Sequence, residues 1–198
     1  MRVGLDSDGV LDNFGNGVKA ALEARGQGHV WKSGPTPQSY WDFFKDWGWE
    51  YSEFKELCDW GVDNGYIFTG HWRRNAVESV ARIKQLGHEV IIITDRSFGS
   101  DPMNSQRNTL AAFEKAGIKY DEIHFTADKT SVPVDMMVED KLQNYDALVA
   151  AGTPTWLINR AWNLIPGGDG RNRINDVSDY ADAVEAATKR GYADLVVA

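Results

Sequence analysis

Short apolar runs alternate with expected helices along this chain, and that order constrains the fold more than any other feature. The runs cover residues 3–5, 89–93, 123–125, 134–138 and 155–158. Helices are expected over about 75–86, 103–116 and 180–189, the first because its apolar residues recur at helical spacing. Strands that alternate with helices predict an α/β fold, a Rossmann-like parallel sheet with helices on both faces.

Polar side chains follow most of these runs, at the points where the strands are expected to end. Ligands of a parallel sheet bind just beyond the carboxyl ends of its strands. Side chains that are far apart in the chain are therefore expected to meet at one edge of the sheet. They are Asp6, Asp8, Thr94, Asp95, Lys129, Glu139 and Asp140.

Three aspartates of this set suit a hard cation. Asp6 and Asp8 can bring one side chain and one backbone carbonyl to a single ion, and Asp140 can add a second carboxylate, as Mg²⁺ prefers. Cys58 is the only cysteine, and the four histidines show no ligand-type spacing. A thiolate or imidazole metal site is therefore not expected, and the predicted cofactor is Mg²⁺.

Thr94, Lys129 and Gly9 complete a predicted phosphate site. A hydroxyl donor and a positive charge can neutralise a phosphate dianion, and backbone N–H groups around a glycine can approach it closely. The net charge of −8 argues against an extended nucleic acid as partner, because its backbone is bound by clustered Lys and Arg. A small phosphate ester is compatible with that charge.

Features of membrane and exported proteins are missing from the sequence. No apolar run approaches the roughly 20 residues that span a bilayer. The N-terminus also lacks the basic region and long apolar stretch of a signal peptide. We therefore expect a cytoplasmic location without membrane contact.

Four segments resemble the motifs of the haloacid dehalogenase-like phosphohydrolases. They are "DSDGVLD" at 6–12, "IIITDR" at 91–96, "DKT" at 128–130 and "VDMMVED" at 134–140. Within that superfamily, the chain is most similar to the 5'(3')-deoxyribonucleotidase branch. This similarity covers the first motif and about residues 65–163.

The resemblance implies a role for each matching residue. Asp6 would attack phosphorus and form an aspartyl-phosphate. Asp8 would protonate the leaving oxygen and then activate the hydrolytic water. Asp6, Asp140 and the carbonyl of Asp8 would bind Mg²⁺, while Thr94 and Lys129 would hold the phosphoryl oxygens.

The segment between the first and second motifs differs in composition from the rest of the chain. Residues 16–70 are rich in Trp and predict short helices, broken by residues 34–37 and by Gly48. The resemblance implies that this segment is a small helical cap on a core of residues 1–15 and 71–198. Phe14 lies where the branch places a ring that stacks on the base, although a core role is an equal alternative.

The chain departs from the family pattern in its terminal acidic pair. The pair is Glu139-Asp140 instead of two aspartates, which leaves the role of Glu139 open. Asp135 is an alternative acidic ligand, but from the start of its strand it would lie at the wrong end of the sheet.

A second departure follows Thr94. The deoxyribonucleotidases often continue with Ser-Pro, whereas this chain continues with Asp95-Arg96. Arg96, together with Arg107, is expected to contact phosphate, and Asp95 is expected to alter which leaving group is accepted. Asp95 and Arg96 are therefore candidate substrate-binding residues.

The function implied by the resemblance is a Mg²⁺-dependent phosphomonoesterase, with a nucleoside monophosphate as the expected substrate. A phosphatase for another small ester such as a sugar phosphate is the nearest alternative. A polynucleotide 3'-phosphatase is disfavoured by the acidic charge. A nucleotide-binding protein on the same scaffold is the non-enzymatic alternative. Related enzymes are often dimers, so a homodimer is compatible, but no residue identifies an interface.

Overall fold

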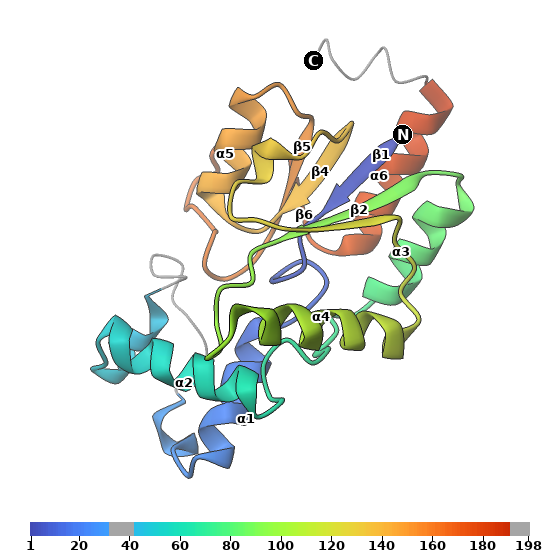
Figure 1. Cartoon of the computed structure of the whole chain (residues 1–198). Helices are drawn as coiled ribbons and strands as arrows, with labels where there is room; N and C mark the ends of the chain where they lie inside the picture. The colour runs from blue at the N-terminus through green and yellow to red at the C-terminus, as the bar shows by residue number, and fades with distance from the viewer. Residues whose placement is uncertain (32–41, 191–198) are drawn as a thin grey trace.

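The computed structural model describes residues 1–31 and 42–190, and within them six parallel strands form one sheet (Figure 1). Their order across the sheet is β3-β2-β1-β4-β5-β6. The strands are β1 (Arg2–Leu5), β2 (Glu89–Thr94), β3 (Glu122–Phe125), β4 (Met136–Glu139), β5 (Thr155–Ile158) and β6 (Arg173–Ile174). The predicted Rossmann-like α/β fold is confirmed.

Helices cover both faces of the sheet because the strand side chains are apolar on both sides. Val90 and Ile92 pack with side chains of α3 (Ala76–Gln85) and α6 (Val177–Arg190). Ile91 and Ile93 face the other side, where Leu148 of α5 (Leu142–Ala150) joins them. Such two-sided burial is typical of parallel sheets.

Strand register brings the ends of the three central strands together. Leu5 in β1 is aligned with Ile92 in β2 and with Val138 in β4. Asp6, Thr94 and Glu139 therefore emerge at the same edge, one or two residues farther along their strands. This edge is where the sequence predicts the site.

Local signals account for most element boundaries. α4 (Pro102–Ala116) begins where the Asp101 carboxylate accepts the N–H of Met103, and it ends at Gly117, whose φ of 70° is left-handed. β6 was not predicted, because two residues are too short to show a pattern. It pairs with β5, and its Arg173 side chain donates to Asp169 and Asn159.

A second hydrophobic cluster lies outside the sheet. It is built from α1 (Phe14–Ala24), the short helix η2 (Phe43–Trp47), α2 (Tyr51–Asp63) and the loop after α2, with Phe98 packed against it. Figure 1 shows α1 and α2 beside the beginning of α4, away from α3 and α6. η2 ends at Gly48, but the predicted break at 34–37 lies outside the described residues. The division into core and cap stays a prediction.

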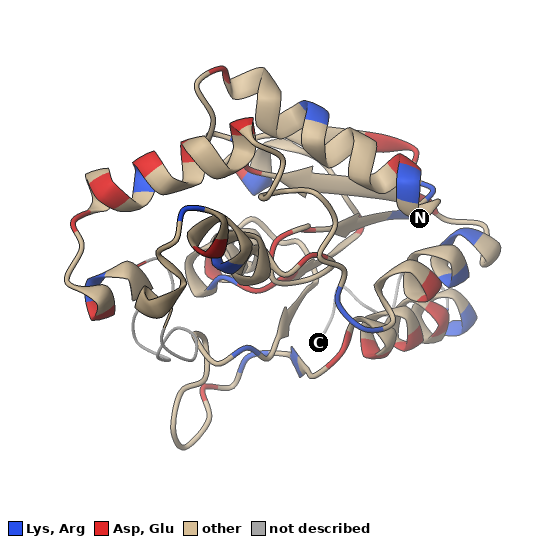
Figure 2. Ribbon diagram, turned by 90° about the horizontal axis from the view of Figure 1, so that it is seen from below, with Lys and Arg blue, Asp and Glu red and all other residues tan. Residues whose placement is uncertain are grey.

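Charged residues of both signs are interspersed along the helices (Figure 2). Between α3 and α6, for example, Arg82 is paired with Asp182 and Glu185. Among the described helices, none combines the length and apolar character needed to cross a membrane.

Candidate active site

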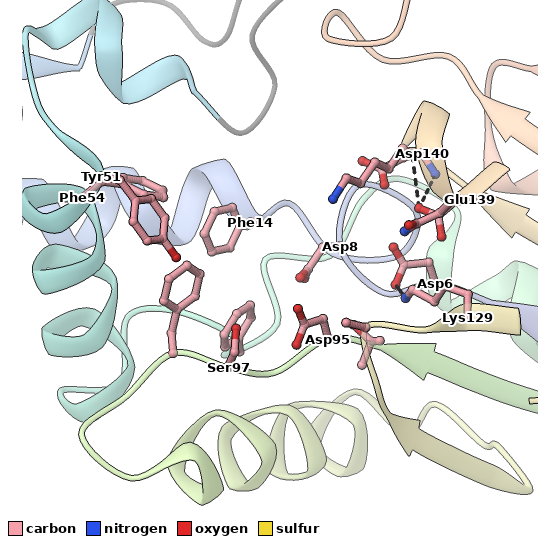
Figure 3. A pocket seen from close by; sticks show the side chains of 16 residues that line it. Asp6, Asp8, Phe14, Tyr51, Phe54, Asp95, Ser97, Lys129, Glu139 and Asp140 are labelled. Carbon is pink, nitrogen blue, oxygen red and sulfur yellow. Dashed lines mark hydrogen bonds and ion pairs between the residues drawn. The ribbon is translucent and has the colours of Figure 1, made fainter. Parts of the chain in front are cut away.

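A cavity of about 350 Å³ opens at the carboxyl ends of β1, β2 and β4 (Figure 3). Its two ends differ in chemistry, with acids and a lysine at the sheet edge and aromatic rings at the other end. Asp8 and Asp95 lie between these ends. The lining residues are Asp6, Asp8, Phe14, Tyr51, Phe54, Phe68, Thr94, Asp95, Ser97, Phe98, Ala127, Lys129, Glu139, Asp140, Lys141 and Asn144.

Three buried carboxylates meet at the sheet edge. Asp6, Glu139 and Asp140 each offer an oxygen, and these atoms all lie within 4.8 Å of one another. Glu139 Oε1 accepts the N–H groups of Asp140 and Lys141, both at 3.1 Å, whereas its Oε2 has no hydrogen-bond partner among the described residues. Glu139, whose role was left open by the sequence, is therefore part of the acidic cluster.

Burial and mutual repulsion raise the pKa values of two of these acids. The pKa of Glu139 is raised first by desolvation and then by the charge of Asp6. The pKa of Asp140 is raised well above its ordinary value by desolvation and by Glu139 and Asp6. Buried carboxylates this close, one with an unpartnered oxygen, are the donor set that a hard divalent cation needs. The residues present fit Mg²⁺.

Lys129 lies beside this cluster and is almost wholly buried. Its Nζ donates to Asp6 Oδ1 at 2.6 Å and to the carbonyl of Ile93. Burial alone would lower the pKa of this amine, but the charges of Asp6 and Glu139 outweigh it and raise the pKa. Thr94 Oγ1 is also buried, without a hydrogen-bond partner among the described residues. The cavity thus contains a fixed ammonium and an unused hydroxyl.

Gly9 lies in the first loop, beside the acidic cluster. Its own N–H donates to the carbonyl of Asp12 at 2.9 Å, and the phosphate contact expected of the N–H groups around Gly9 stays a prediction. Its φ is 76°, and a Cβ added there would lie 1.9 Å from Asp140 Oδ2. Gly9 therefore allows the first loop to approach the acidic cluster more closely than any side chain would permit.

Gly9→Ala is expected to lower both stability and activity, because the new methyl group displaces Asp140. Gly117→Ala is a matched control, since Gly117 has a similar φ of 70° with open space around it. The control should cost about 1–2 kcal/mol of unfolding free energy and leave turnover unchanged. Urea unfolding and assays of the expected phosphomonoesterase activity compare the two; equal effects would contradict the close-approach role of Gly9.

The Asp8 carboxylate points away from the three clustered acids. Arg96 binds it with both ends of its guanidinium, at 2.7 Å to Oδ2 and 3.2 Å to Oδ1. Burial raises the pKa of Asp8 to about 6, although the charge of Arg96 opposes the increase. Only the backbone carbonyl of Asp8 is left for the predicted cation contact.

Three other sequence candidates lie outside the cavity. Arg96, a predicted substrate contact, is engaged by Asp8 and does not line the cavity. Arg107 is exposed on α4 and pairs with Asp101 and Asn104. Asp135 accepts the N–H of Arg2 at the opposite edge of the sheet, so it cannot contribute to the acidic cluster.

Aromatic rings form the other end of the cavity. The ring of Phe14 stacks on Phe68 and Phe98, with centroid distances of 5.7 and 6.1 Å. Phe14 both lines the cavity and belongs to the second hydrophobic cluster. It packs in a core, and its predicted stacking on a base stays a prediction. Phe68 and Phe98 were missed by sequence reasoning, because both lie in loops without a motif.

Trp162 is another residue that sequence reasoning missed. Its indole N–H donates to Asp140 Oδ2 at 3.0 Å. The next residue, Asn163, donates to the backbone carbonyls of Asp140 and Ile158 at 2.7 and 2.8 Å. The loop after β5 therefore orients the last acid of the cluster.

Solved structures similar to this chain include two phosphatases. A D,D-heptose 1,7-bisphosphate phosphatase from Burkholderia thailandensis matches with a TM-score of 0.55 and 16% identity, over 93% of this chain and 98% of that one. The enzyme of the same name from B. bronchiseptica, complexed with magnesium and phosphate, matches with a TM-score of 0.51 and 16% identity over the same shares.

A dehalogenase is similar to the same extent. An L-2-haloacid dehalogenase matches with a TM-score of 0.53 and 11% identity, over 92% of this chain and 98% of that one. No protein-family model and no curated protein matches the chain by sequence. Since the likeness covers nearly the whole chain, its six-stranded parallel sheet with flanking helices has the haloacid dehalogenase-like fold.

Proposed function

We propose that the protein is a Mg²⁺-dependent phosphomonoesterase that hydrolyses nucleoside monophosphates. The observation that carries the proposal is the contact of 2.6 Å between Asp6 and Lys129 beside two further buried acids. The fixed Asp6 carboxylate is suited to attack a phosphoryl group. The Lys129 ammonium and the Thr94 hydroxyl, which has no hydrogen-bond partner among the described residues, are suited to stabilise the charge of that group.

The proposed reaction has two steps. In the first, an Asp6 carboxylate oxygen bonds to phosphorus, the bond from phosphorus to the leaving oxygen breaks, and Asp8 gives that oxygen a proton. In the second, Asp8 takes a proton from water, which attacks phosphorus and releases phosphate from Asp6. Asp6 is oriented for this role because its Oδ1 accepts from both Lys129 and the N–H of Ser7.

Charge stabilisation in both steps is assigned to Lys129 and Thr94. These groups would hold the phosphoryl oxygens as negative charge builds on them. When bound, Mg²⁺ would supply further neutralisation of these oxygens. Asp6, Glu139 and Asp140 would hold it, together with the carbonyl of Asp8.

The aromatic end of the cavity supports a flat, uncharged leaving group. Phe14, Phe54, Phe68 and Phe98 line this end of the cavity and give it an apolar aromatic surface, which suits a flat ring. Among the described lining residues, the basic ones are Lys129 and Lys141, which is next to Asp140. A second phosphate at the aromatic end would find no cation among the described residues that line it, which favours a nucleoside monophosphate over a bisphosphate.

Assays with an aryl phosphate, with Mg²⁺ and with chelator, test the phosphatase assignment. Turnover is expected only with the metal, and its absence would favour a binding function. A panel of ribo- and deoxyribonucleoside 5'- and 3'-monophosphates, sugar phosphates and a sugar bisphosphate then tests the substrate class. Nucleotides should have the highest kcat/KM; uniform rates would refute the nucleotidase assignment and leave the phosphatase assignment standing.

A further inference from the structure

Arg96 is a buried arginine that is bound by several groups of the protein. Besides its two bonds to Asp8, it donates from Nε to Thr109 Oγ1 at 2.6 Å and from one amino group to the carbonyl of Asp95 at 2.6 Å. Its side chain is 1% exposed. A guanidinium held on several sides in this way is immobilised before any substrate arrives.

The ring of Phe68 closes one face of this guanidinium. The Arg96 Cζ lies 3.9 Å from the ring centroid, which is close enough for a cation–π contact. Phe68 has a φ of 60°, which is uncommon for a bulky residue, so backbone strain is tolerated where its ring covers Arg96. Thr109, which accepts from Arg96 Nε, is itself fixed because its hydroxyl donates to the carbonyl of Ser105.

Asp8 depends on Arg96 for its orientation. Within residues 1–31 and 42–190, Arg96 is the side chain that donates hydrogen bonds to the Asp8 carboxylate, and it contacts both oxygens. In Figure 3, Asp8 lies between the acidic cluster and the aromatic end. A phosphate ester that spans the two ends would place its scissile oxygen near this point.

We infer that Arg96 is a positioning residue, which holds the Asp8 carboxylate away from the cation-binding acids and facing the leaving-group oxygen. This inference rests on the proposed phosphatase function. When the bond from phosphorus to that oxygen breaks, the proton passes from Asp8 to the departing oxygen. An Asp8 released from Arg96 would turn, and the transfer would lose its geometry.

The test compares esters whose leaving groups differ in their need for a proton. An alkyl phosphate or nucleoside monophosphate needs protonation of its leaving oxygen, whereas 2,4-dinitrophenyl phosphate does not. The measured quantity is kcat/KM, because it reports the first step without the hydrolysis of the aspartyl-phosphate. In Arg96→Gln, kcat/KM should fall by about 10²-fold for the alkyl ester and by less than about threefold for the dinitrophenyl ester.

Further variants separate positioning from a loss of structure. Arg96→Lys keeps the buried charge without the two-pronged contact, so it should fold and show an intermediate leaving-group dependence. Asp8→Asn should show the same selective loss as Arg96→Gln. Arg82→Gln, which removes only surface ion pairs between α3 and α6, should leave both esters unaffected.

Inhibition by inorganic phosphate distinguishes this role from direct substrate binding. If Arg96 positions Asp8, the inhibition constant for phosphate should stay within about twofold of the wild-type value in Arg96→Lys. Equal losses for all esters, or a large rise in that constant, would overturn the inference. Absence of any metal-dependent turnover in the wild-type protein would instead refute the proposed function.

Discussion

Asp6→Asn is expected to reduce phosphatase turnover by roughly four orders of magnitude or more, the scale seen when a catalytic nucleophile is removed. An amide oxygen is a poor nucleophile towards phosphorus, and the neutral side chain also weakens cation binding. The fold should persist, because the amide oxygen can still accept from Lys129 and from the N–H of Ser7, as Asp6 Oδ1 does at 2.6 and 2.8 Å.

A matched variant tells whether this loss is specific to the site. Asp135→Asn makes the same chemical change at the opposite edge of the sheet, where the side-chain oxygen can still accept the N–H of Arg2. Its turnover should equal that of the wild type. Trapping with beryllium fluoride should produce an adduct on Asp6 in the wild-type protein; substantial activity of Asp6→Asn would exclude Asp6 as the nucleophile.

Lys129→Met should impair both stability and catalysis. The change removes the ammonium that contacts Asp6 while leaving three acids buried together, so the unfolding free energy should fall by roughly 3–5 kcal/mol. Turnover should fall by about 10²–10³-fold, because the phosphoryl oxygens lose a fixed positive charge. Urea unfolding and steady-state assays measure the two effects.

Added Mg²⁺ and a control variant at the surface test whether the lost positive charge explains the effect of Lys129→Met. Mg²⁺ should restore part of the stability of Lys129→Met, because a cation bound by the acids replaces some of the missing charge. Lys84→Met, which breaks an exposed ion pair with Asp121, should change stability by less than about 1 kcal/mol. A Lys129→Met protein as stable as the wild type without metal would refute the charge-balance argument.

The haloacid dehalogenase-like fold brings the residues at its central strand ends together at low conformational cost. Asp6, Thr94 and Glu139 each extend a central strand whose register is set by the sheet, so backbone order alone brings them together. Loop residues then adapt the site, as Gly9 does by approaching Asp140. Rigid strands with variable loops allow such a scaffold to accept different leaving groups.

The parallel sheet, its flanking helices and the meeting of acids with Lys129 were predictable from residue order. Apolar periodicity reports which face of each element is buried, and parallel strands necessarily bring their carboxyl ends to one edge. Asp135 was correctly placed at the far edge for the same reason. These properties are local or follow from topology, so they can be read along the chain.

The hydrogen-bond and ring-contact partners of the site residues were decided by the packing of the tertiary structure. The pairing of Arg96 with Asp8 joins residues 88 positions apart, and neither local pattern indicates it. The amide of Gly9 binds the carbonyl of Asp12, and the rings of Phe68 and Phe98 meet Phe14 only after the loops have folded. A side chain binds whichever group the completed fold brings within reach, and that depends on every element packed around it.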